Sequence, residues 1–190
     1  MDLIKLQDIS YIINKGKFIK REEVNREGTV CAIGFSDISN GDLTTFIPKV
    51  KLENEYMDLK MYGIENNDII LPVITRENLI IKQLNLKNPS NNNIIFSSRA
   101  IYIRSDPNKY IPVFLYHLLS TYEYKRRLLD EVYTRGHNNV AYQISLERLR
   151  NFEIPKFSIE EQIKILTKEK KLIEKMIIIQ EQLEKLYKKI

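Results

Sequence analysis

The side chains that most often carry out catalysis are scarce in this chain of 190 residues. It has one cysteine, Cys31, and two histidines, His117 and His137. A zinc site usually takes three or four Cys, His or carboxylate ligands at short, regular spacings, and no such spacing occurs here. Cys31 lies inside the apolar run TVCAIGF, where a thiol is more often part of the core than a nucleophile. The sequence therefore predicts neither a zinc site nor a cysteine enzyme.

The carboxylates and glycines also lack a catalytic pattern. Asp68 and Glu77 could approach each other in a hairpin, but no downstream Glu-x-Lys completes the pattern of a metal-dependent nuclease. No Gly-rich loop followed by Lys-Ser/Thr is present to bind nucleotide phosphates. Asp106-Pro107-Asn108 resembles the acidic-Pro-Pro-aromatic motif of amino-methylating DNA enzymes only superficially, because the second Pro and the aromatic residue are missing. We expect a protein that is not an enzyme and that needs no metal and no cofactor.

Composition narrows the partners and the compartment. Thirty Lys and Arg against 25 Asp and Glu give a net charge of +5, which permits a nucleic-acid partner without requiring one. A single cysteine excludes an internal disulfide and favours a reducing compartment. Residues 1–15 contain no continuous apolar stretch typical of a signal peptide, and the apolar runs are too short to span a membrane. The expected location is the cytoplasm.

The predicted secondary structure, which must position the polar side chains, changes along the chain from mostly strands to mostly helices. Short runs of β-branched residues bounded by turn residues predict strands at residues 3–6, 29–35, 69–74, 79–84, 94–96 and 100–103. Residues 7–13 are predicted to form one or two helical turns. Apolar spacings of three and four predict a helix over residues 111–132, broken near Ser120-Thr121. Ser145 is predicted to cap a short helix over residues 146–151.

Residues 158–190 contain no Gly and no Pro and are predicted to form one long helix. Ser158 and Glu161 have the spacing of a capping box at its start. Apolar residues at coiled-coil spacing form a predicted dimerisation seam: Ile165, Leu172, Met176, Ile179, Leu183, Leu186 and Ile190. A helix of roughly 50 Å needs a partner for such a seam, and the alternative is that it folds back on its own domain. The predicted fold class is α+β, with a β-rich globular domain over residues 1–157 and a long C-terminal coiled-coil helix over residues 158–190.

The order of several motifs resembles one half of a type I restriction–modification specificity (S) subunit. The opening Leu6-Gln7-Asp8-Ile9 with Gly16-Lys17, and the segment Asn67-Asp68-Ile69-Ile70-Leu71, are similar to the family's "L-x-D-I … G-x" and "G-D-I-L". The segment Phe114-Leu115-Tyr116-His117-Leu118-Leu119-Ser120 is similar to the helix that follows its sheet. The most specific block comprises Gly136, Ile144-Ser145-Leu146, Ile154-Pro155 and Glu160-Glu161-Gln162. Asn67 replaces a Gly of the family pattern, Phe157 stands where a second Pro is usual, and the Gly136 loop is longer than usual.

The resemblance implies a function and a set of partners. A full specificity subunit has two target-recognition domains joined by helices that pair antiparallel, and each domain reads one half of a split DNA target. One domain and one helix would make this chain a half-subunit that forms a homodimer. The implied partners are double-stranded DNA, an adenine methyltransferase subunit and a restriction subunit, and those subunits would supply the chemistry.

Three polar clusters are then the predicted DNA-binding residues, since Arg, Lys, Asn and Gln are natural readers of base edges. They are Arg135, His137, Asn138, Asn139 and Tyr142; Lys15, Lys17, Lys20 and Arg21; and Arg76 with Asn78. At each single position, the alternative is a solvated loop residue.

Two other functions stay open. The chain could be a structural or adaptor protein that oligomerises through its C-terminal helix and reads no DNA. A stand-alone nuclease is ranked last, because the sequence contains no metal-binding pattern.

Overall fold

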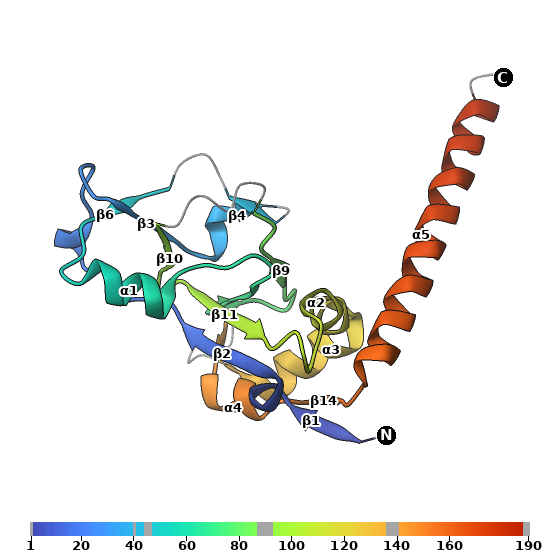
Figure 1. The fold of residues 1–190 in the computed structure, drawn as a ribbon, viewed down its shortest axis with the longest axis horizontal. Helices are drawn as coiled ribbons and strands as arrows, with labels where there is room; N and C mark the ends of the chain where they lie inside the picture. The colour runs from blue at the N-terminus through green and yellow to red at the C-terminus, as the bar shows by residue number, and fades with distance from the viewer. Residues whose placement is uncertain (1, 40, 44–46, 87–92, 136–140, 188–190) are drawn as a thin grey trace. The chain divides into compact units, whose positions relative to one another are not determined.

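A four-stranded antiparallel sheet runs through the N-terminal unit of the computed structural model (Figure 1). Its order is β2-β11-β7-β9, with bounds Ser10–Lys15, Ala100–Ser105, Ile69–Pro72 and Lys82–Gln83. All four residues of β7 and five of the six residues of β11 are buried. These two inner strands read as continuous apolar runs because neighbours cover both of their faces.

The chain divides into two compact units, residues 1–156 and residues 157–190. The structure describes residues 2–39, 41–43, 47–86, 93–135 and 141–187. For Arg135, Ile173 and residues 177–187, only the backbone is described.

A second sheet, β10-β3-β6, contains the parallel pair of the fold. Its strands are Ile94–Phe96, Val30–Ile33 and Lys49–Val50, with β10 parallel and β6 antiparallel to β3. Alternate residues of the parallel pair enter two separate cores. Ile33 and Phe96 pack on one side, where the Phe96 ring stacks on Tyr102 at 4.5 Å, and Val30 and Ile95 pack on the other. A strand with both faces buried explains why the sequence here shows no polar alternation.

The remaining strands form three small sheets. β12 (Tyr133–Arg135), β13 (Tyr142–Ile144) and β8 (Ile74–Thr75) make a sheet in the order β12-β13-β8, β1 (Leu3–Lys5) pairs with β14 (Glu153–Pro155), and β4 (Ile38–Ser39) pairs with β5 (Asp42–Leu43). The N-terminal unit contains the helices α1 (Glu55–Tyr62), α2 (Pro112–Ser120), α3 (Tyr122–Arg127) and α4 (Leu146–Asn151) (Figure 1). Helix α1 packs on β10, and the π-helical turn Leu128–Val132 follows α3. Three short 3₁₀ helices cover Leu6–Ile9, Arg21–Glu23 and Phe35–Asp37.

Most predicted elements are confirmed, and three differ. The strand predicted over residues 79–84 is shorter, because β9 covers only Lys82–Gln83. The break between α2 and α3 falls at Thr121, and Ser145 caps α4 by accepting a hydrogen bond from the Arg148 amide. The helical turn predicted for residues 7–13 is wrong beyond Ile9, because β2 begins at Ser10 and pairs with β11. Helix α1 was not predicted, since it carries no apolar stripe, and it is capped by Asn54. The mixed α+β class with a β-rich domain and a C-terminal helix is confirmed.

A buried ion pair holds the turn that leads into β7. Asp68 accepts two hydrogen bonds from Arg104 of β11, from Nε at 2.9 Å and from Nη2 at 2.8 Å, and one from the Glu65 amide at 2.8 Å. Nη2 of Arg104 also donates to the Gly63 carbonyl. Asn67 stands at φ 68°, a left-handed conformation that glycine and asparagine adopt most easily. This geometry explains why an asparagine can occupy position 67 in this turn.

Three buried tyrosines make the domain sensitive to high pH. The hydroxyls of Tyr102, Tyr110 and Tyr133 donate to the carbonyls of Met61, Pro155 and Pro72. Burial raises the pKa of all three, that of Tyr102 to about 12.

Because these pKa values exceed the ordinary value of about 10, the protonated hydroxyls contribute stability below that pH, and the contribution is lost as the pH rises through the higher folded values. In an alkaline titration followed by tyrosinate absorbance and circular dichroism, we expect three of the 11 tyrosines to ionise only as the domain unfolds. Ionisation of all 11 while the circular dichroism stays native would contradict this.

The C-terminal unit consists of α5, Ile159–Tyr187. The predicted capping box is confirmed: the Glu161 amide donates to Oγ of Ser158 at 3.2 Å, and the Ser158 amide donates to the Glu161 carboxylate at 2.7 Å. Within the described residues, no helix is both long enough and apolar enough to cross a membrane.

Candidate nucleic-acid interface

Two of the three predicted DNA-binding clusters come together through strand pairing. In the β8–β13 ladder, Tyr142 faces Thr75, and the Ile144 amide donates to the Val73 carbonyl at 3.0 Å. This pairing places Arg76, which directly follows β8, beside the start of β13. Arg76 and Asn78 are exposed, and Tyr142 is half-buried. His137, Asn138 and Asn139 lie outside the described residues, and the side chain of Arg135 is not described.

Three hollows share lining residues with one another and are here called together the Arg99 groove. Its central hollow, of about 360 Å³, is lined by Phe35, Ser36, Pro72, Val73, Ile74, Ser98 and Arg99. A hollow of about 450 Å³ shares Phe35, Pro72 and Ile74 with it and extends to Arg76 and Asn78. A third, of about 210 Å³, shares Ser98 and Arg99 and extends to Ile19 and Val24. The groove thus has an apolar floor with serine, asparagine and arginine side chains along it.

The third predicted cluster borders the other end of the groove. The Lys17 amide donates to the Phe96 carbonyl at 2.8 Å, and the Ser98 amide donates to the Lys17 carbonyl at 2.7 Å, so this segment lies beside Ser98. Lys20 and Arg21 are exposed there. Lys17 is engaged elsewhere, because its ammonium group pairs with the buried Asp58 of α1 at 3.1 Å. Lys17 therefore contributes to the structure of this segment, whereas Lys20 and Arg21 are available to a ligand.

Arg99 occupies the centre of the groove, although the sequence did not predict it as a binding residue. Its Nη2 donates to Asp37 at 3.0 Å and its Nε to Oγ of Ser97 at 3.4 Å, while 57% of its side chain is exposed. A Cβ atom on Gly34 would lie 2.8 Å from Cβ of Arg99, so a glycine is needed at position 34 to leave room for it. The available signal was a polar Ser97-Ser98-Arg99 turn between two apolar strands.

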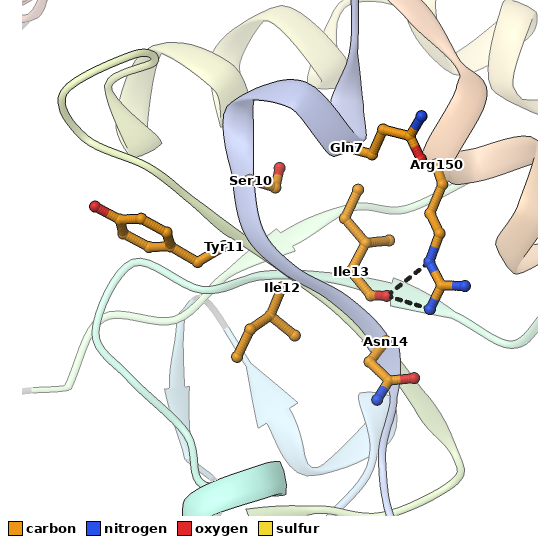
Figure 2. A pocket seen from close by; sticks show the side chains of 7 residues that line it. All are labelled: Gln7, Ser10, Tyr11, Ile12, Ile13, Asn14 and Arg150. Carbon is orange, nitrogen blue, oxygen red and sulfur yellow. Dashed lines mark hydrogen bonds between the residues drawn. The ribbon is translucent and has the colours of Figure 1, made fainter.

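Lys15 lies at another polar surface, along the free edge of β2. Figure 2 shows Arg150 of α4 reaching the Ile13 carbonyl, to which Nε and Nη2 donate at 3.3 and 3.0 Å. Oδ1 of Asn14 accepts from the Lys15 amide at 2.9 Å. A hollow of about 370 Å³ lies here, lined also by Gln7, Ser10 and Tyr11. Side chains thus occupy backbone groups that an added strand would need, which protects the edge against pairing. Lys15 is not a lining residue of the Arg99 groove.

The described residues hold no cluster of three or more His, Cys, Asp or Glu side chains that could bind a metal ion. Cys31 packs partly buried against the core around Phe96. His117 belongs to α2 and is half-buried, and Asp68 is held by Arg104. The Arg99 groove is lined by two arginines, Arg76 and Arg99, and by serine and asparagine side chains, a chemistry that suits an anionic, hydrogen-bonding ligand.

The fold has clear counterparts among solved structures. No family model matches the sequence, and no curated protein matches it. The HsdS subunit from Thermoanaerobacter tengcongensis superposes with a TM-score of 0.61 at 21% identity, over 94% of this chain and 43% of that one. The chain has the fold of a type I specificity subunit. The predicted resemblance is confirmed at the level of the fold.

Two further specificity-subunit structures agree. The type I S subunit from M. genitalium matches with a TM-score of 0.52 at 14% identity, over 88% of this chain and 37% of that one. A chain from a structure of complex assembly and conformational transition of the type I restriction–modification system matches with a TM-score of 0.59 at 16% identity, over 94% and 39%. This chain therefore spans about two-fifths of the length of each of these three chains.

Proposed function

We propose that this chain is the DNA-recognition subunit of a type I restriction–modification system and is not itself catalytic. It directs an adenine methyltransferase subunit, and a restriction subunit where the system has one, to a bipartite DNA target in the cytoplasm. The observation that supports the proposal is the Arg99 groove, which is lined by Arg99 and by Arg76 and Asn78 of one predicted cluster, on a domain with the specificity-subunit fold.

The groove suits DNA for physical reasons. Exposed arginine and lysine side chains neutralise phosphates, whereas asparagine and arginine can also pair with base edges. Arg76, Asn78 and Arg99 line the groove, and the exposed Lys20 and Arg21 directly follow Ile19, which lines its third hollow. The apolar floor, including the exposed Ile74, matches the thymine methyl group or a sugar face.

The exposed apolar residues Leu172 and Met176 of α5 support a homodimer. With one recognition domain and one helix, two copies related by a two-fold axis would restore two domains, with the α5 helices paired antiparallel as a coiled coil and spacer. The expected target is an interrupted palindrome. Mapping of methylated adenines in host DNA tests this: a symmetric bipartite motif supports a homodimer, and an asymmetric motif indicates a different second half.

Binding of this chain, together with its methyltransferase subunit, to a pool of random-sequence duplexes tests DNA recognition. Selection should enrich one motif. The logarithm of the binding constant should fall linearly with the logarithm of the salt concentration. In Lys20→Ala/Arg76→Ala, we expect weaker binding. The salt slope should be lower by about 0.9 for each phosphate that the variant no longer neutralises.

The matched control is Lys60→Ala/Arg126→Ala, which removes the same charge from exposed positions that do not line the groove. Equally weakened binding in both double variants would show a general charge effect and no groove. The alternative, an adaptor protein that reads no DNA, predicts normal self-association with no enriched motif. The observation that favours an adaptor is the exposure of the apolar residues Leu172 and Met176 of α5.

A further inference from the structure

Arg99 is held in one orientation by groups on both sides of it. Asp37 accepts from Nη2 at 3.0 Å, and Oγ of Ser97 accepts from Nε at 3.4 Å. Asp37 is itself fixed, because its Oδ2 also accepts from the Gly34 amide at 2.7 Å. Asp37 is the last residue of the 3₁₀ turn Phe35–Asp37, and Phe35 and Ser36 of this turn line the groove.

One edge of the guanidinium is left for a ligand. A guanidinium has five N–H groups, and the two hydrogen bonds above use one on Nε and one on Nη2. Within the described part of the chain, Nη1 has no partner. Three N–H groups remain, two on Nη1 and one on Nη2, and a guanidinium can present one N–H from each terminal nitrogen in parallel. Parallel donors of this kind match a pair of acceptors, such as two phosphate oxygens or O6 and N7 of guanine.

We infer that Arg99 contacts DNA through this end edge, presenting parallel donors to an acceptor pair, and that Asp37 is the residue that positions it. The inference rests on the proposed function and adds the central contact, which no motif in the sequence indicated. Preorganisation is the physical benefit: a guanidinium already held by Asp37 and Ser97 loses less conformational freedom when DNA binds.

The sign of the effect at Asp37 makes the inference testable. Removing a carboxylate from a DNA-facing surface should strengthen binding if only net charge matters. If Asp37 positions Arg99, Asp37→Asn should instead weaken binding, because the ion pair is broken while the amide oxygen can still accept from the Gly34 amide. The double variant Arg99→Ala/Asp37→Asn should bind no worse than Arg99→Ala alone, since Asp37 acts through Arg99.

The experiment measures the full chain with its methyltransferase subunit on a duplex that carries the motif enriched by the wild type. Arg99→Ala should weaken binding about tenfold or more, as expected for a bidentate contact, with the thermal midpoint unchanged. Arg126→Ala is the control, since Arg126 is exposed and its pairing with Asp130 is only a 3.9 Å contact. Arg99→Gln keeps the aliphatic stem and replaces Arg99→Ala if the latter fails to fold.

Two further readouts identify the acceptor. A phosphate contact predicts that Arg99→Ala lowers the salt slope by about 0.9, keeps the motif and is largely rescued by Arg99→Lys. A guanine contact predicts an unchanged slope, loss of preference at one guanine and no rescue by lysine. Both outcomes support the inference. Wild-type binding to a defined motif with unaltered binding by Arg99→Ala would overturn it, as would tighter binding by Asp37→Asn. A wild type that enriches no motif contradicts the proposed function, and the inference with it.

Discussion

Replacement of Asp68 by alanine is expected to lower the free energy of unfolding of the globular domain by roughly 3–5 kcal/mol. Asp68 is 1% exposed and Arg104 15% exposed, so the substitution leaves the Arg104 charge buried without its main partner. It also removes the acceptor for the Glu65 amide in the turn that leads into β7. For a domain of this size, the thermal midpoint should fall by about 2–4 °C for each kcal/mol.

The ion pair is not itself a source of that much stability. Burial raises the pKa of Asp68, although the Arg104 hydrogen bonds oppose the rise, which shows that desolvation of the carboxylate is costly. The double variant Asp68→Asn/Arg104→Met should therefore recover part of the stability that the single variants lack, because no unpaired buried charge remains. Chemical denaturation followed by circular dichroism measures all of these differences.

A matched control is available on α3. Arg126 and Asp130 are both about 70% exposed and lie 3.9 Å apart, so Arg126→Ala should cost less than about 1 kcal/mol. If Asp68→Ala and Arg126→Ala are destabilised by similar amounts, the Asp68–Arg104 pair does not hold the turn in the way the geometry indicates.

Deletion of residues 170–190 is expected to convert a homodimer into a folded monomer. The mass measured by light scattering would fall from about twice 22.5 kDa to somewhat below 22.5 kDa, because the monomer also lacks the deleted residues. In the single chain, Ile165, Leu172 and Met176 are exposed by 42%, 54% and 68%. Burying such apolar residues against a second helix is the driving force of a coiled coil. The side chains of Ile179, Leu183 and Leu186 are not described, and Ile190 lies outside the described residues.

A substitution pair separates the seam from the helix as a whole. Leu172→Glu/Met176→Glu places charges in the seam and should give the same monomer while α5 stays helical. Lys170→Glu/Lys171→Glu introduces the same residues at exposed positions on the outer face of the helix, away from the seam, and should leave the dimer intact. A dimer mass that survives the truncation would exclude the seam as the dimer contact. Loss of the dimer in both substitution pairs would point to general charge sensitivity.

Several elements could be predicted because their signals are local. Ser145 with α4 and Ser158 with Glu161 at the start of α5 confirm that a cap and the residues next to it are sufficient to place a helix end. The break at Thr121 follows from the same local chemistry, since its hydroxyl accepts from the Tyr124 amide and starts α3. The spacing of motifs along the chain was likewise enough to predict a fold that the solved specificity subunits share.

Contacts between distant residues decided the rest. Tyr11, Ile12 and Ile13 favour a strand locally, and pairing with β11, about 90 residues later, extends that strand over residues 10–15. The pairing of β8 with β13 brings Arg76 beside Tyr142, and Asp37 meets Arg99 across 62 residues. The sequence alone thus determined the caps, the long helix and the family of folds, because those depend on residues a few positions apart. The binding groove and the orientation of Arg99 came only from the tertiary structure, because nothing in the spacing of residues predicts which strands pair.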